Sequence, residues 1–528
     1  MTLQDKLNEV EARRQKLLQG GGAGEVERQH KMGKLTARER LAKLFDPGTF
    51  QELDLFIRPL RTGFDVDERE LPADGAITGF GEVHGRSVYA YIHDFTVMGG
   101  VQSVGQNHKV SKLMERAVEA GVPYVGMVDS GGIKVHDMFG RTGFRPIVGG
   151  SGMAFTSGIF PGPPLASGAV PQVSLMLGPC YAGSAYSPTM ADFVIMRKGT
   201  SYMSVASPPL LKAVTFADVT QEQIGGANLH ATVTGIADFL METDDQAIET
   251  CRELLTYLPL NYREKAPVVD MGDDPKRRDE SLLAIDPSQP YDMHQVITAV
   301  LDKGRFLELQ SLFAKSMIIG FGRFDGHTVG VVANNPAENG GVLDKNTCDK
   351  MARFVRWCDA FSIPLVILVD TVGFLPSANA ERSPDGLIRN ATKPVFALAE
   401  ATVPRVVMYI GQCFGTARLA MGSLRLGMDN VYAWPSARVA RIAPDEAVES
   451  IYGEEIKAAP NPDEVRKERL QQLLKTHMQF PFHTVEQLMA EDIIDPRDTR
   501  LVLIRTLKML EHKVPPARPW RKHSLIQR

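Results

Sequence analysis

Val122-Pro-Tyr-Val-Gly-Met-Val-Asp-Ser-Gly-Gly132 and Ile363-Pro-Leu-Val-Ile-Leu-Val-Asp-Thr-Val-Gly373 are two versions of one sequence, separated by 241 positions. The same separation relates Gly79-Phe-Gly-Glu-Val-His-Gly85 to Gly320-Phe-Gly-Arg-Phe-Asp-Gly326. A third pair, residues 170–180 and 403–413, is separated by 233 positions, so the first half holds eight additional residues in between. Repeats at a fixed separation indicate duplicated structural units. The chain of 528 residues is therefore predicted to be a tandem duplication.

Each half alternates short apolar stretches with stretches of helical periodicity. Apolar runs bounded by glycine predict strands at 87–93, 124–128 and 173–177, and again at 328–333, 365–369 and 406–410. Helical spacing of apolar residues predicts helices at 108–120 and 346–361. Alternating strands and helices imply an α/β fold with buried strands. The polar, proline-punctuated segment 266–290 is the predicted linker between an N-terminal domain, 1–265, and a C-terminal domain, 291–528.

Local signals add four expectations. Apolar residues at 3, 7, 10 and 17 predict a packing helix that ends at the glycines 20–22, and Thr36 with Glu39 forms a capping box for a helix at 37–45. The glycines of 79–85 have one residue too many for a dinucleotide loop and predict a hairpin. The run 140–164 is rich in glycine and proline, so no helix is expected there.

Composition excludes several classes of protein. The 59 Lys and Arg residues nearly balance the 63 Asp and Glu residues, which leaves no basic field for nucleic acid. No apolar run approaches the roughly 18 residues of a membrane span, and the first 20 residues do not resemble a signal peptide. We therefore expect a cytoplasmic protein without direct membrane insertion. The five cysteines form no C-x-x-C pair, which argues against disulfides and a structural metal site.

The common catalytic motifs are absent, and two glycine-rich strand exits remain. These are Gly178-Pro-Cys-Tyr-Ala-Gly-Ser-Ala185 and Gly411-Gln-Cys-Phe-Gly-Thr-Ala417, at equivalent places in the two halves. Small residues between a buried strand and a helix leave backbone N–H groups open to a cleft, where they can stabilise negative charge on a carbonyl oxygen. The alternative is that small residues here only allow close helix–strand packing. Cys180 and Cys413 are interpreted as packing residues.

These and other motifs resemble the carboxyltransferase β subunits of biotin-dependent acyl-CoA carboxylases, of the propionyl-CoA carboxylase β-chain type. The resemblance runs over nearly the whole chain, and the motifs that carry it are Gly33-Lys-Leu-Thr-Ala-Arg-Glu-Arg40, Asp94-Phe-Thr-Val97, Asp129-Ser-Gly-Gly132, Gly178-Pro-Cys180, Tyr186-Ser-Pro188, Val332-Ala-Asn-Asn-Pro336, Gly373-Phe-Leu-Pro376, Gly386-Leu-Ile-Arg389 and Tyr432-Ala-Trp-Pro435. The resemblance implies a tandem duplication of two crotonase/ClpP-like domains. It also implies a hexamer whose active sites lie between the N-terminal domain of one subunit and the C-terminal domain of another.

The resemblance further implies a mechanism with two enolates and two oxyanion holes. Biotin, carried on a separate protein, delivers the carboxyl group, and biotin itself then removes the α-proton of the acyl-CoA thioester. N–H groups near Ala182 and Gly183 would hold the thioester oxygen, and those of Thr416 and Ala417 the biotin oxygen. The sequence has no ATP-binding signature and no biotinylation motif, so biotin carboxylase and a biotin carboxyl carrier protein or domain are expected as partners.

The chain departs from the family pattern at both holes. Tyr181-Ala-Gly-Ser184 replaces the usual Ala-Gly-Gly-Ala, and Gly415-Thr-Ala417 replaces Gly-Gly-Ala. The added Cβ atoms are acceptable where φ is negative. The residues that the resemblance assigns to the substrate are Gly131, Gly132, Ile133, Lys134, Arg418 and Leu419; Arg418 could pair with a substrate carboxylate or be an ordinary surface or interface residue.

Two other functions stay open at this point. The same chemistry could run in reverse, in the α subunit of a biotin-dependent decarboxylase of a dicarboxylic acyl-CoA, such as malonyl-, methylmalonyl- or glutaconyl-CoA. The altered hole motifs also allow a non-catalytic assembly subunit of a carboxylase complex.

Overall fold

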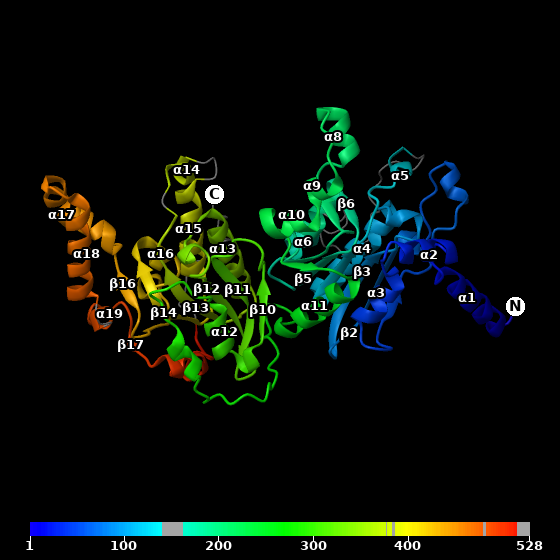
Figure 1. Cartoon of the computed structure of the whole chain (residues 1–528). Helices are drawn as coiled ribbons and strands as arrows, with labels where there is room; N and C mark the ends of the chain where they lie inside the picture. The colour runs from blue at the N-terminus through cyan, green and yellow to red at the C-terminus, as the bar shows by residue number, and fades with distance from the viewer. Residues whose placement is uncertain (140–161, 376, 383–385, 479–481, 515–528) are drawn as a thin grey trace. The chain divides into compact units, whose positions relative to one another are not determined.

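The computed structural model describes residues 1–139, 162–375, 377–382, 386–478 and 482–514. The chain forms two compact units, Met1–Lys265 and Ala266–Arg528 (Figure 1). Residues 266–290 belong to the second unit, where Arg277 donates hydrogen bonds to the carbonyls of Ala299 and Leu301. Leu282 is buried in the core of that unit. The polar segment between the halves is thus packed onto the half that follows it.

The first unit is built around a seven-stranded sheet. Its strand order is β1-β2-β3-β4-β5-β7-β9, antiparallel from β1 to β3 and parallel from β3 onward. A separate parallel pair is formed by β6 and β8. The strands are β1 Gln51–Leu53, β2 Ala76–Val83, β3 Arg86–His93, β4 Tyr124–Val128, β5 Gln172–Met176, β6 Pro179–Tyr181, β7 Phe193–Arg197, β8 Tyr202–Ser204 and β9 Phe239–Met241.

The sheet of the second unit repeats this arrangement strand by strand. Its order is β10-β11-β12-β13-β14-β15-β17, and β16 pairs with the end of β14 as β8 pairs with β6. The shared order confirms the predicted tandem duplication. The strands are β10 Phe306–Leu309, β11 Met317–Phe324, β12 His327–Asn334, β13 Leu365–Thr371, β14 Arg405–Phe414, β15 Asn430–Ala433, β16 Arg438–Ala440 and β17 Asp492–Ile493.

Helices precede the first strand and connect later strands in both units. The principal ones are α4 Val104–Ala120 and α11 Asp244–Tyr257 in the first unit, and α13 Lys345–Ala360 and α15 Leu387–Glu400 in the second. None of the helices that the structure describes is long and apolar enough to cross a membrane. The others are α1 Leu3–Leu17, α2 Ala23–Lys31, α3 Ala37–Leu44, α5 Val135–Phe139, α6 Gly162–Ala166, α7 Tyr186–Thr189, α8 Pro208–Thr215, α9 Gln221–Gly225, α10 Ala227–Leu229, α12 His294–Val300, α14 Ala378–Arg382, α16 Gly415–Ala420, α17 Pro444–Ala458, α18 Pro462–His477, α19 Phe482–Glu486 and α20 Thr499–Met509.

The glycine pattern of the first repeat forms a hairpin, as predicted. His84 and Gly85 connect β2 to β3 with φ of +52° and +70°, and Asp325 and Gly326 connect β11 to β12 with φ of +51° and +79°. Two successive residues with positive φ make the turn that matches the twist of antiparallel strands. The predicted capping box is also confirmed, because Thr36 and Glu39 cap each other's backbone at the start of α3.

Two local expectations need correction. The first helix forms as predicted, but Leu17 is the only buried residue in α1, so this helix contributes little packing within the chain. The proline-rich run does contain a helix, α6, at its end. Pro163 and Pro164 occupy the second and third positions of α6, where a missing N–H costs nothing. The rest of that run, 140–161, lies outside the described residues.

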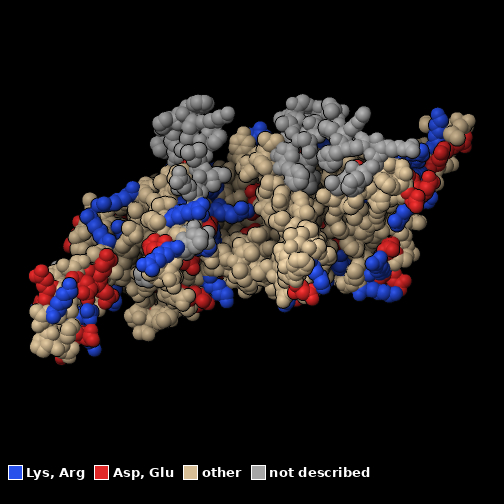
Figure 2. Space-filling model, turned by 90° about the horizontal axis from the view of Figure 1, so that it is seen from above, with Lys and Arg blue, Asp and Glu red and all other residues tan. Residues whose placement is uncertain are grey.

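Charged side chains of both signs are mixed on the surface helices. Figure 2 shows this mixture along α1 and over the helix pair α17–α18, where Arg469 pairs with Glu455 at 2.6 Å. Pairing within such short stretches is consistent with the small net charge of −4. These surfaces therefore present no extended field of one sign.

Each unit also buries a lysine at equivalent positions, 109 and 350. The ammonium of Lys109 donates to three backbone carbonyls between residues 54 and 76, at 2.7 to 3.4 Å. The ammonium of Lys350 donates to the carbonyls of Gln310 and Phe313, at 2.9 and 2.8 Å. Lys109 thus satisfies carbonyls between the end of β1 and the first residue of β2, and Lys350 satisfies carbonyls between β10 and β11.

Candidate active site

The two strand exits have the same local structure. In the first unit, β6 ends at Tyr181 and a 3-10 turn begins at Ala182, followed by α7. In the second, β14 ends at Phe414 and α16 begins at Gly415. The separation of 233 positions aligns Ala182-Gly-Ser184 with Gly415-Thr-Ala417, residue for residue. Both predicted holes are therefore helix starts that directly follow a strand.

The first residue of each motif has a left-handed backbone. The φ angle is +54° at Ala182 and +60° at Gly415. The condition for an acceptable Cβ atom, a negative φ, is therefore not met at Ala182. A non-glycine residue in this region costs roughly 1–2 kcal/mol, so the first exit retains this conformation despite the strain.

Backbone N–H groups are candidate donors at both exits, and the first exit also holds the Tyr181 hydroxyl, which has no hydrogen-bond partner among the described residues. The first N–H groups of a helical turn have no carbonyl partner within the helix. Ser184 is 2% exposed and donates its hydroxyl to the Tyr181 carbonyl, while Ala417 is 1% exposed. Thr416 is exposed. Small or turned-away side chains leave the N–H groups of these turns as donors for an oxygen atom that carries negative charge.

The loops after β4 and β13 are a second matched pair. Gly132 and Gly373 have φ of +113° and +138°, and each N–H is 3.2 Å from a hydroxyl two residues earlier. Ile133 bridges to Gln102 in parallel, as Phe374 bridges to Leu343. Gly131 is exposed, and Ile133 is 47% exposed. Gly131, Gly132 and Ile133 therefore form an open ledge beside the first exit strand, where a ligand could pack.

Lys134 does not share this exposure. Its side chain is 2% exposed and its ammonium lies 3.1 Å from the Asp137 carboxylate. The other Asp137 oxygen accepts the backbone N–H of Val104 at the start of α4. Lys134 thus takes part in a buried ion pair that joins the loop to α4, which favours a structural role over direct binding of substrate.

Arg418 and Leu419 follow the second exit on α16. Arg418 is 7% exposed, and no described residue accepts a hydrogen bond from its Nε. It lies beside Tyr409 of β14: burial raises the pKa of the Tyr409 hydroxyl, and Arg418 opposes that rise. Leu419 is half-buried. Arg418 is therefore a buried residue, and it forms no ion pair with any residue that the structure describes.

A buried network of charged residues is centred on Asp129, next to Gly178 at the start of the first exit. The Asp129 carboxylate accepts from Lys34 at 2.6 Å, from Arg40 at 2.8 Å and from Gln29 at 3.2 Å. Burial lowers the pKa of Lys34, and the Asp129 charge opposes that shift. Arg40 is fully buried and also donates to Asp244 at 2.8 Å. The network ties the N-terminal helices to the strand end.

This role of the motif at 33–40 was missed by sequence reasoning. Lys34 and Asp129 are 95 residues apart, so local periodicity does not connect them. The available signal was chemical: two cations near the N-terminus and a lone aspartate at the end of an apolar strand. Unpaired charges are rarely buried, so such an aspartate requires a cationic partner.

The cysteines carry no nucleophilic chemistry. Cys180 and Cys413 are both 0% exposed. Burial raises the pKa of Cys180 to about 12 and that of Cys413 well above its ordinary value, so neither forms a thiolate readily. In the described parts of the chain, no group of three or more His, Cys, Asp or Glu side chains could hold a metal ion.

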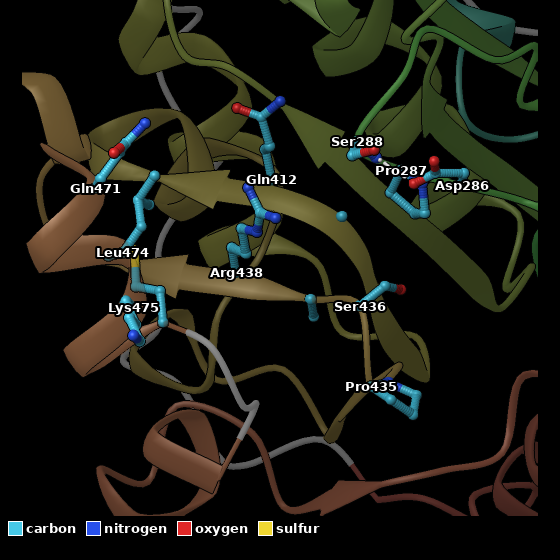
Figure 3. Close-up of a pocket in the computed structure, with 13 residues that line it drawn as sticks. Asp286, Pro287, Ser288, Gln412, Pro435, Ser436, Arg438, Gln471, Leu474 and Lys475 are labelled. Atoms are coloured by element: carbon cyan, nitrogen blue, oxygen red, sulfur yellow. Dashed lines mark hydrogen bonds between the residues drawn. The ribbon is translucent and has the colours of Figure 1, made fainter. Parts of the chain in front are cut away.

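A pocket of about 440 Å³ lies beside the second exit. Gln412 on β14, Arg438 on the adjacent strand β16 and Lys475 on α18 line this pocket (Figure 3). Ser288, Ser436 and Leu474 also line the pocket. Both cations are exposed. Asp286 also lines the pocket, and its pKa is lowered by hydrogen bonds from Ser288 and, to a smaller extent, by the charge of Arg438. The pocket is therefore a polar, partly basic opening.

A duplicated α/β fold, with a matched strand exit in each half, is the architecture that this chain shares with a family of carboxyl-transfer enzymes. The family model described as Carboxyl transferase domain matches residues 28–526, and the chain belongs to this family. Its fold is the crotonase-like fold, duplicated in tandem.

Similar proteins match over essentially the full length. The chain is 41% identical over 529 residues to the propionyl-CoA carboxylase carboxyltransferase subunit of Haloferax mediterranei, covering 100% of both chains. It is also 41% identical over 530 residues to the methylmalonyl-CoA decarboxylase subunit alpha of Veillonella parvula, covering 99% of both. The crystal structure of the transcarboxylase 12S hexamer with methylmalonyl-coenzyme A bound matches with a TM-score of 0.90 and 38% identity, covering 99% of this chain and 98% of that one.

Proposed function

We propose that this chain is the carboxyltransferase component of a biotin-dependent acyl-CoA carboxylase. It would transfer a carboxyl group between carboxybiotin on a separate carrier and the α-carbon of an acyl-CoA. The observation that carries the proposal is the pair of matched strand exits, one in each unit, where a helical turn whose first N–H groups have no partner within the turn directly follows a strand. Two donor sites suit a reaction in which two carbonyl oxygens acquire negative charge.

The first exit would hold the thioester oxygen of the acyl-CoA. The N–H groups of Ala182 and Gly183 would stabilise the charge that develops there when the α-proton leaves. The exposed ledge of Gly131, Gly132 and Ile133 would contact the acyl-CoA beside this exit. One lost donor of this type typically costs about 10²- to 10³-fold in rate.

The second exit would hold the ureido oxygen of biotin through the N–H groups of Thr416 and Ala417. Carboxybiotin supplies the carboxyl group and, once it has released that group, the base for the α-proton. Arg438 and Lys475, which line the neighbouring pocket, would attract the anionic carboxyl group. No side-chain nucleophile is required, in agreement with the buried thiols.

Reverse chemistry is the second candidate function. Two relatives, from Veillonella parvula and Propionigenium modestum, are named methylmalonyl-CoA decarboxylase subunit alpha, at 41% and 39% identity. Such a subunit would use the same two exits on a dicarboxylic acyl-CoA. The partner distinguishes the two directions: co-purification with an ATP-dependent biotin carboxylase indicates carboxylation, and co-purification with a membrane decarboxylase subunit indicates the reverse.

The assembly is also part of the proposal. We propose a hexamer, because the 38% identical transcarboxylase 12S structure is described as a hexamer assembly. Biotin carboxylase and a biotin carboxyl carrier protein or domain would complete the enzyme.

The test is an assay of the purified chain with free carboxybiotin and acetyl-, propionyl- and butyryl-CoA, with the carboxylated thioester detected by mass spectrometry. Gly183→Val should abolish turnover with the oligomer intact, because the branched side chain narrows the first exit. Gly453→Ala, on α17 with no atom within 4 Å of the added Cβ, is the control and should retain full activity. Absence of turnover of any thioester by the wild-type chain and its complex would leave the non-catalytic assembly subunit as the better account.

A further inference from the structure

Asp370 lies on β13 opposite an irregularity in the neighbouring strand. The β13–β14 ladder pairs Val369 with Tyr409 and then Thr371 with Cys413, so three residues of β14 lie opposite Asp370 alone. Backbone groups in such a bulge lose their ladder partners. β14 leads from this bulge into the second strand exit at Gly415.

The Asp370 carboxylate replaces the missing ladder partner. Oδ1 accepts the backbone N–H of Gln412 at 2.8 Å, and Oδ2 accepts the Tyr291 hydroxyl at 2.9 Å. Asp370 is 3% exposed. A Cβ atom on Gly411 would lie 2.2 Å from Oδ2, so the position of the carboxylate requires glycine at 411.

The equivalent aspartate of the first half is held differently. Position 412 corresponds to Pro179 in the first exit, and proline has no backbone N–H to donate. Asp129 instead pairs with Lys34 and Arg40. Asp370 forms no ion pair with any Lys or Arg of the described residues; its partners are the Gln412 amide and the Tyr291 phenol.

We propose that Asp370 is the positioning residue of the second strand exit, and that it acts as a buried anion without a cationic partner. Its two hydrogen bonds fix the bulge three residues before Gly415, and so set the direction of the N–H groups that follow. Loss of the negative charge loosens the second exit and leaves the first unchanged. The biotin-binding role of this exit rests on the proposed function, whereas the positioning of its backbone does not.

The surroundings of Asp370 make its charge sensitive to mild acid. The titratable groups that face it are Tyr291, from the segment before α12, and Cys413, from β14. Neither is positively charged. Burial raises the pKa of Asp370 to about 6, and the hydrogen bonds from Gln412 and Tyr291 oppose that rise. A proton on Oδ1 removes the acceptor of the Gln412 N–H, and a proton on Oδ2 reverses the bond to the Tyr291 hydroxyl, so protonation removes or reverses one of the two bonds.

Hydrogen exchange tests the positioning role without any assay of activity. In Asp370→Ala, peptides covering 411–417 should exchange about 10- to 100-fold faster than in the wild-type protein, since a hydrogen bond to a charged group is lost. The matched peptides 178–185 should keep the wild-type rate. Equal rates in 411–417 for the two proteins would overturn the proposal. If Asp370→Ala does not fold, Tyr291→Phe replaces it in the experiment. This variant removes only the hydrogen bond between Tyr291 and Asp370, so we expect a smaller acceleration of exchange in 411–417.

The pH profile tests the role of the charge. Wild-type turnover should fall with decreasing pH through about pH 6. Asp370→Asn keeps the shape and an acceptor for Gln412 but does not titrate, so it should lack this acidic limb. Tyr291→Phe removes a donor to the ionised form, which raises the pKa of Asp370 and moves the limb to higher pH.

Asp359→Asn is the control, because Asp359 accepts the backbone N–H groups of residues 402 and 403 at the other end of β14. Its acidic limb should match that of the wild-type protein. An acidic limb that persists unchanged in Asp370→Asn would refute the role of the charge. A wild-type chain without turnover would count against the proposed function, and the exchange experiment would still decide the positioning role.

Discussion

A Cβ atom on Gly178 would lie 1.8 Å from Oδ1 of Asp129, so the first strand exit and the buried carboxylate beneath it fit only with glycine at this position. Lys34 and Arg40 clamp that carboxylate from two sides, at 2.6 and 2.8 Å. The aspartate therefore cannot move away from a larger residue. The position of the first exit is set by a charge network whose members lie far apart in the sequence.

Gly178→Ala should consequently damage both stability and activity. The forced displacement of a packed, ion-paired side chain costs about 1–3 kcal/mol, and the exit moves with it. We expect a lower midpoint of urea unfolding and a rise in KM for acyl-CoA. Gly24→Ala, on α2 with open space around the new Cβ, should change neither quantity. A Gly178→Ala protein with wild-type KM would contradict the link between this contact and the first exit.

Ala182 and Gly415 occupy equivalent positions with positive φ, so each residue can be replaced by the other as a test. Gly415→Ala introduces the residue that the first exit already has at φ +54°, with no atom within 4 Å of the new Cβ. It should destabilise the protein by about 1 kcal/mol and lower kcat by less than 10-fold. Ala182→Gly should relieve comparable strain. Unfolding curves and steady-state kinetics measure both. A loss of activity above 100-fold in Gly415→Ala would show that the two exits differ in conformation.

Removal of the buried ammonium of Lys109 should destabilise the first unit. Lys109→Met has a similar length but leaves three carbonyls without a donor, at a cost of about 3 kcal/mol. Lys350→Met should have the same kind of effect on the second unit. Differential scanning calorimetry and urea unfolding give the changes. Lys112→Met, at a partly exposed ion pair with Asp54, is the control, with an expected loss below about 1 kcal/mol. An unchanged unfolding midpoint in Lys109→Met would refute this account.

His294 should make stability depend on pH. Glu308 at 3.1 Å and Asp292 at 2.6 Å raise the pKa of His294 to about 9, against the opposing effect of burial. Because the pKa of His294 is higher in the folded state, its protonation stabilises the folded protein. This stabilisation is fully present below the unfolded pKa near 6.5 and is lost as the pH rises through 9. Unfolding midpoints between pH 6 and 9.5 should therefore fall more steeply in the wild-type protein than in His294→Gln. Parallel curves would contradict the assignment.

The sequence predicts the strands, helices and turns of this molecule well, because these elements follow from the local pattern of apolar, polar and glycine residues. The β2–β3 hairpin, the α3 capping box and the strand at 365–371 depend on residues that are neighbours in the chain. Because the chain is a repeat, the same pattern occurs twice. A strand predicted in the first half can therefore be checked against the equivalent segment of the second half.

The contacts that shape the site are less accessible from sequence. The positive φ of Ala182 is imposed by the surrounding fold against the preference of alanine, and no residue pattern signals it. The burial of Lys134 with Asp137 depends on how a loop folds onto α4, which a list of charged residues does not contain. Arg418 likewise combines a charge with burial, a pairing that composition treats as improbable.

The paired lysines show which features the two halves share. Lys109 and Lys350 hold backbone carbonyls in the same way inside separate halves, so this buried contact belongs to the repeated part of the fold. Pro179 and Gln412 occupy equivalent positions with different chemistry. The halves are therefore alike in their scaffold and unlike in the residues at their strand exits, so a change that suits one exit need not suit the other.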